Sequence, residues 1–303
     1  MNATQSKVRV ENGARPAAAV ELTPEGVLAA ALPGRGAAPV YAFTPMAPGA
    51  LVPGINESNL IAADAVSRAI AAALNDVAPK TRSVTLIVPD ASVRVFVLDF
   101  DSLPSKPAEA IPVIKFRLRR LIPFDSEHAG VSYQVLTESK DECRVLIAVM
   151  PGALLSEYEA AVRTAGYETG AMLPSGLAAL AAVEADEPAL IACLGPHALT
   201  TAITNGQDLL LYRAVDLPTD SAVRIAEIQR DVAVASAFFE DKMGARPKKL
   251  FYSGSEDANA FARLLAGADL EVVELAARPE TGAATTLGRM SFAGIAGALT
   301  GAA

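Results

Sequence analysis

Residues 190–215 read LIACLGPHALTTAITNGQDLLLYRAV, three short apolar runs separated by turn residues. The runs Leu190–Leu194, Leu199–Thr204 and Leu209–Val215 are typical of β-strands. Asn205-Gly206 lies between the last two, and this dipeptide is a strong signal for a two-residue hairpin turn. The segment therefore predicts three consecutive strands, of which the last two form a hairpin.

A helix and a further strand are predicted after these three strands. Apolar residues recur there at three- and four-residue steps, which indicates one buried helical face made of Ile225, Ile228, Val232, Ala235 and Phe239. Lys249–Tyr252 then reads as a short strand that ends at Ser253-Gly254. The predicted order is strand, strand, strand, helix, strand.

The same order is predicted about 170 residues earlier. Ala17–Leu22 and Val27–Ala31 flank the turn Thr23–Gly26, and Val40–Phe43 follows as a third strand. A helix with Leu60, Ala63, Val66, Ile70 and Leu74 on its apolar face leads to the strand Val84–Val88, and Asn56 or Ser58 is its expected N-cap. A repeated unit of this kind predicts two related α/β lobes that face each other across a cleft.

A segment of different character, Ser92 to Gly166, separates the two copies. It predicts a strand at Val93–Leu98 and a helix with Ile111, Ile114, Leu118 and Leu121 on its buried side. Pro112 is expected in the first turn of this helix and Pro123 just after its end. Strands at Val131–Leu136 and Arg144–Val149 and a helix at Leu154–Ala165 complete a small α+β subdomain inserted into the first lobe.

The amino-acid composition argues against several classes of function. The 303 residues contain 26 Lys or Arg and 34 Asp or Glu, a formal charge of −8, which argues against nucleic-acid binding. Two Cys and two His leave no pattern for a metal centre or a His-based relay. No secretory signal and no apolar run of about 20 residues is present, which predicts a cytoplasmic protein.

Two neighbouring motifs then resemble one family. Leu118–Phe124 (LRRLIPF) and Val131–Leu136 (VSYQVL) are similar to the Ile-Pro-Phe and Tyr-Gln-Val-Leu segments of PilM, the actin-like assembly protein of type IV pili. Pro45–Asn56, Glu227–Gly254 and the small-residue tail Phe292–Leu299 resemble other PilM segments in the same order. The resemblance covers about residues 17–300. The cytoplasmic domain of the type II secretion protein GspL is related, but a membrane helix follows it, and the lack of one here favours PilM.

The resemblance implies an actin-like (ribonuclease H-like) fold with a first lobe at 17–186, an inserted subdomain at about 90–166 and a second lobe at 187–303. Residues 1–16 are expected to be disordered, and a last helix at about 288–300 is expected to pack back on the first lobe.

The resemblance further implies a cytoplasmic scaffold, peripheral at the inner membrane, that docks the N-terminal tail of a PilN-type bitopic protein beside the subdomain. Membrane contact would be only indirect. Other pilus assembly proteins and a second copy of the chain are further expected partners. The residues expected at the docking site are Arg117, Arg120, Ile122, Pro123 and Phe124.

An actin-like cleft would hold ATP and magnesium with Gly-rich hairpins and an acid. Here Glu21 replaces the Asp of the first hairpin, Pro24 and Pro196 each remove an amide donor, and Cys193 replaces the acid of the second. We therefore expect a degenerate site without a nucleotide, no catalytic residues and no metal. If ATP does bind, Glu21, Gly195 and Gly254 are the expected contacts.

The alternatives to a scaffold without a nucleotide are an ATP-binding or ATP-hydrolysing PilM, a type II secretion component and, more remotely, a sugar kinase of the same fold.

Overall fold

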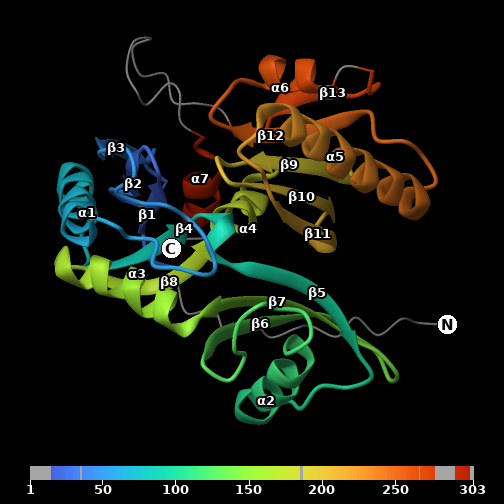
Figure 1. Ribbon diagram of the computed structural model, residues 1–303, viewed down its shortest axis with the longest axis horizontal. Helices are drawn as coiled ribbons and strands as arrows, with labels where there is room; N and C mark the ends of the chain where they lie inside the picture. Colours follow the sequence, from blue (N-terminus) through green and yellow to red (C-terminus); the bar gives the residue numbers. More distant parts are fainter. Residues whose placement is uncertain (1–14, 35, 185–186, 266, 277–290, 301–303) are drawn as a thin grey trace.

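A computed structural model describes residues 15–34, 36–184, 187–265, 267–276 and 291–300. Two five-stranded sheets form two lobes, and a smaller sheet with one helix extends from the first lobe (Figure 1). Among the described residues no helix combines the length and the apolar character needed to cross a bilayer. Most of the predicted N-terminal segment 1–16 and the start of the predicted last helix, 288–290, lie outside these residues.

The first lobe is built on the strand order β3-β2-β1-β4-β8. Strands β1, β2 and β3 are antiparallel neighbours, whereas β4 and β8 run parallel to β1. The elements of this lobe are β1 (Ala18–Thr23), β2 (Gly26–Ala31), β3 (Val40–Pro45), α1 (Ala63–Val77), β4 (Ser83–Val88), α3 (Gly152–Thr164) and β8 (Glu168–Pro174). Strands β1, β2 and β4 are buried almost throughout, because helices cover the sheet on both faces.

The second lobe repeats this arrangement with the order β11-β10-β9-β12-β13. Its elements are β9 (Ala189–Leu194), β10 (Ala198–Asn205), β11 (Asp208–Asp216), α5 (Ser221–Met243), β12 (Lys249–Gly254), α6 (Ala258–Leu264) and β13 (Glu271–Glu274). The antiparallel and parallel pairings match those of the first lobe strand for strand. The duplication predicted from the sequence is confirmed.

The subdomain consists of the sheet β5-β7-β6 with α2 packed on it. Its elements are β5 (Arg94–Phe100), α2 (Pro107–Leu118), β6 (Ala129–Glu138) and β7 (Cys143–Pro151). Helix α3, expected in this unit, instead buries Leu154, Tyr158 and Val162 in the core of the first lobe. The separate sheet and its helix therefore end at Pro151 rather than near 166, because α3 has its apolar face toward α1.

Two short helices fill the space between the lobes in Figure 1: α4 (Ser175–Ala179) and α7 (Ala293–Leu299). Ile295, Ala298 and Leu299 of α7 pack on buried residues of β1, β2 and α4. The contact is close, since a Cβ on Gly297 would lie 1.9 Å from the carbonyl oxygen of Ala178. A segment at the far end of the sequence thus completes the core of the first lobe.

Several local expectations are wrong, among them the burial of Ile225, which is 37% exposed on α5. Helix α1 starts after Ala62 without a side-chain cap, because Ser58 instead donates its hydroxyl proton to Glu157. Pro112 lies in the second turn of α2, since the helix already begins at Pro107, and α2 ends at Leu118 rather than at Pro123. Leu121, expected to be buried, lies beyond the helix and is 44% exposed.

Candidate functional site

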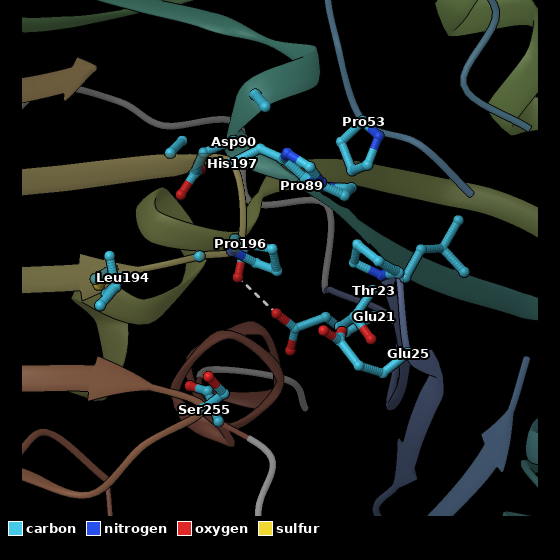
Figure 2. A pocket seen from close by; sticks show the side chains of 18 of the residues that line it. Glu21, Thr23, Glu25, Pro53, Pro89, Asp90, Leu194, Pro196, His197 and Ser255 are labelled. Carbon is cyan, nitrogen blue, oxygen red and sulfur yellow. Dashed lines mark hydrogen bonds between the residues drawn. The ribbon is translucent and has the colours of Figure 1, made fainter. Parts of the chain in front are cut away.

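A cavity of about 340 Å³ lies between the two lobes. The β1–β2 hairpin lines it from the first lobe, and the β9–β10 hairpin faces it from the second. Figure 2 shows Glu21 and Glu25 on one side, with Leu194 and Pro196 opposite them. This is where the repeated topology brings the two hairpins together, as predicted.

Glu21 is the most deeply buried acid of the cavity, with 5% of its surface exposed. The Ser175 hydroxyl donates to its Oε1 at 2.5 Å, and the backbone N–H of Ile295 also donates to the carboxylate. Burial raises the pKa of Glu21 to about 7. The two hydrogen bonds oppose this rise, whereas the negative charge of Asp90 increases it. Glu21 is therefore partly protonated near neutral pH.

Asp90 joins the two lobes. Its two carboxylate oxygens each accept the Gly176 N–H at 3.0 Å, and one of them accepts the Thr200 hydroxyl of the second lobe at 3.1 Å. Burial raises its pKa to about 6, although these hydrogen bonds oppose the rise. The sequence analysis missed Asp90 and Ser175. A single acid directly after the buried strand β4 was the available signal for Asp90, because ligands gather at the carboxyl ends of parallel strands.

The cavity lining does not fit a magnesium-bound polyphosphate. Among the described residues that line it there are three carboxylates and four prolines, but no Lys or Arg. The hairpin amides are also in use, since Gly26 N–H bonds to Thr23 Oγ1 at 3.2 Å and Gly195 N–H to the Ala198 carbonyl at 2.9 Å. A polyphosphate here would meet negative charge and few free donors.

The other residues that the sequence analysis considered for the cleft are placed as follows. Gly195 lines the cavity, whereas Gly254 itself does not, although its neighbours Ser253 and Ser255 do. Cys193 also lines it, and burial raises the pKa of its thiol, so it is not a ready nucleophile. No cluster of three or more metal-ligating side chains occurs in the part of the chain that the structure describes.

A second cavity, of about 400 Å³, lies where the subdomain rejoins the first lobe. Its walls are the segment before α1, the end of β7 and the start of α3. They comprise Ile55, Asn56, Glu57, Ser58, Pro151, Ala153, Leu154 and Glu157. Apolar side chains and two carboxylates therefore face the same opening.

A polar network fixes the shape of this second cavity. The Glu157 carboxylate accepts the backbone N–H groups of Asn59 and Leu60, at 3.1 and 2.8 Å. The buried amide of Asn59 donates to Ser92 at 2.8 Å and to the Tyr158 hydroxyl at 3.0 Å. Because buried polar groups hold one geometry only when satisfied, the segment before α1 is held rigidly on α3.

The five residues predicted for partner docking divide into two groups. Arg117, Arg120 and Pro123 are exposed on and after α2, whereas Ile122 is buried in the subdomain core and Phe124 packs against that core. None of the five lines either cavity.

Comparison with known proteins identifies the fold. No protein-family model and no curated protein sequence matches this chain. A chain of a PilM–PilN type IV pilus biogenesis complex superposes with a TM-score of 0.72 and 19% identity, over 95% of this chain and 98% of that one.

Two further solved structures are similar. The cytoplasmic domain of EpsL, an inner-membrane component of the Vibrio cholerae type II secretion system, has a TM-score of 0.50 and 13% identity over 85% of each chain. A Bacteroides thetaiotaomicron protein with an actin-like ATPase fold and unknown function has a TM-score of 0.54 and 9% identity, over 97% of this chain and 99% of that one. At these identities the likeness shows the fold: the chain is a two-lobed actin-like protein with a subdomain inserted in its first lobe.

Proposed function

We propose that this chain is an actin-like scaffold of a type IV pilus assembly machine, similar to PilM, which docks the tail of a PilN-type membrane protein. The supporting observation is the superposition on a chain of the PilM–PilN complex, which extends over 95% of the sequence and includes the subdomain. The weaker likeness to EpsL makes a type II secretion component the alternative. In either role the chain would work on the cytoplasmic face of the inner membrane.

The second cavity is our candidate docking groove for this tail. Ile55, Pro151 and Leu154 supply apolar surface, and Glu57 and Glu157 supply negative charge. Such a groove fits an extended peptide that carries apolar side chains and a positive charge. The network around Asn59 supports the assignment, because a groove that is already rigid loses little entropy when a peptide binds.

Titration of a fluorescent peptide with the N-terminal sequence of the PilN-type protein from the same genome tests this proposal. Ala153 is exposed and lines the groove, so Ala153→Arg should fill it and weaken binding at least about tenfold. Ala237→Arg, which makes the same change on an exposed site of α5, is the matched control and should bind normally.

The same titration examines the residues predicted from the sequence. A double variant Arg117→Glu/Arg120→Glu should weaken peptide binding if the α2 side chains recognise the tail. Peptide binding that survives Ala153→Arg would contradict the groove, and a peptide that binds neither variant nor the native chain would contradict PilN-type docking itself.

We also propose that the cleft between the lobes holds no nucleotide and serves the scaffold as a structural joint. The support is the acidic and proline-rich lining, together with the bridge that Asp90 makes between α4 and β10. The chain would then act through binding rather than through catalysis.

A further inference from the structure

The outer face of α2 combines exposed apolar side chains with positive charge. Phe116 is 71% exposed and Val113 40%, and Leu121 just beyond the helix is 44% exposed, whereas Ala110, Ile114 and Leu118 form the buried face of the helix. Large apolar residues gathered on one exposed face are unusual in a chain that has no partner there.

Arginines lie among these apolar residues. Val113, Phe116 and Arg117 are three or four residues apart on the exposed side of α2, and Arg120 follows in the turn just after the helix. Arg117 and Arg120 make no hydrogen bond or ion pair with any residue that the structure describes, whereas Arg119 is paired with Glu127. Two cations are therefore free to meet an external anion.

The local charge is opposite to that of the whole chain. Residues 106–120 contain five Lys or Arg and one Glu, a charge of +4, although the protein carries −8. Lys115 and Arg119 turn toward Glu127, but Arg117 and Arg120 remain on the outside. This local excess of positive charge lies on α2 and the turn after it, at the far end of the molecule from the second lobe's α6 (Figure 1).

We propose that this face of α2 binds directly to the surface of an anionic membrane, with Phe116 inserted among the headgroups and Arg117 and Arg120 beside lipid phosphates. Basic residues near an anionic surface and an aromatic ring at headgroup depth are the two features such binding requires. Neither cavity described above includes a residue of α2, and no groove that could hold an extended peptide is described beside this face, which favours a lipid surface as its partner. The inference goes beyond the proposed function, in which the membrane is reached only through a partner.

Vesicle binding by the full chain tests the proposal. The protein should sediment with vesicles of equal parts phosphatidylglycerol and phosphatidylcholine at low salt, and should stay in solution with pure phosphatidylcholine. Arg117→Glu/Arg120→Glu should lower the partition coefficient about 30-fold or more, since each basic residue contributes about a factor of five. Arg68→Glu/Lys80→Glu makes the same change of charge at exposed positions of the first lobe and should have little effect.

A spectroscopic measurement separates insertion from mere attraction. The chain contains no Trp, so Phe116→Trp provides a single emission signal. Its emission should shift to the blue on anionic vesicles and be quenched by brominated lipid. Val223→Trp places the same probe at an apolar residue of α5 that is 51% exposed, and its emission should not change.

The outcomes decide between lipid and protein partners. Absence of binding to anionic vesicles, equal binding to both vesicle types, or binding that the double variant leaves intact would each overturn the proposal. A double variant that loses the PilN-type peptide but keeps the vesicles would assign the face to protein docking instead. Failure with vesicles leaves the peptide titration unaffected, so the two proposals can fail separately.

Discussion

Glu21 illustrates how one residue can change the character of a cleft. It lies in β1 at the position where the nucleotide-binding pattern has an acid exposed to a hydrated metal, but here it is buried beside Ser175 and α7. A Cβ on Gly294 would lie only 2.8 Å from its carboxylate, so the side chain fills the space at this point. Its charge therefore faces protein rather than solvent, which raises its pKa to about 7.

This raised pKa predicts how stability depends on pH. The folded chain holds a proton on Glu21 that the unfolded chain, with a pKa near 4.5, releases, so the free energy of unfolding falls as pH rises from about 4.5 to about 7. Glu21→Gln has a similar shape and no charge. It should gain about 3 kcal/mol relative to the native chain over this interval, as measured by urea unfolding at several pH values.

The control for this measurement is Glu25→Gln, which alters an exposed carboxylate in the same hairpin and should leave the pH profile unchanged. Asp90 titrates in all three proteins, and because its charge raises the pKa of Glu21, the difference between Glu21→Gln and the native chain includes the interaction of the two carboxylates. A constant difference between Glu21→Gln and the native chain, from about pH 4 to about pH 8, would mean that folding does not shift the pKa of Glu21.

At the scale of elements, α7 shows how strongly the C-terminal segment belongs to the first lobe. It is a helix of seven residues, too short to be stable alone, and it is held by close packing on α4 and β1. The small residues of its sequence make this packing possible, because the backbones of α7 and α4 approach each other closely at Gly297.

Gly297→Ala should therefore be strongly destabilising. The added Cβ would lie 1.9 Å from the Ala178 carbonyl oxygen, and relief requires the two backbones to separate. We expect a loss of about 2 kcal/mol or more in thermal or urea unfolding. Gly34→Ala meets nothing within 4 Å and should change stability by less than about 1 kcal/mol. Equal stability of the two variants would show that α7 does not pack as described.

The inserted sheet shows that the order of helices and strands along the chain does not determine which part of the molecule each helix packs on. The sequence predicted the helix at α3 and the strand at β7, yet nothing local tells whether α3 packs on the subdomain or on the first lobe. That choice depends on contacts such as Asn59 with Tyr158, which join residues 99 positions apart. The second cavity, which we propose as the docking groove, arises from the same long-range contacts, so it could not be found from motifs.

At the scale of the whole molecule, the two lobes are joined across the cleft. Asp90 links α4 to β10, and Arg94 of the subdomain forms an ion pair at 2.6 Å with Asp216 of the second lobe. The repeated strand order makes the cleft, but these contacts and the acidic lining set its chemistry. The joint can hold the lobes without a ligand.

Saturating Mg-ATP should accordingly leave the thermal midpoint unchanged. A nucleotide present at a hundred times its dissociation constant would add about 2.7 kcal/mol of stability and raise the midpoint by several degrees. Fluorescence-monitored melting with and without Mg-ATP makes the measurement, and ADP and AMP are informative additions. A saturable rise with a half-point in the micromolar range would contradict the proposal and restore the ATP-binding alternative.

The sequence by itself determined the duplicated strand order, the inserted segment and the prolines in both hairpins, because alternation, turn dipeptides and helical spacing are local properties of the chain. Only the tertiary structure decided that Glu21 is buried and Asp90 spans two lobes, that α3 and α7 complete the first lobe, and that Phe116 faces outward beside two unpaired arginines. These features depend on which distant surfaces meet and exclude water, and a residue's charge, partners and exposure follow from that meeting rather than from its neighbours in sequence.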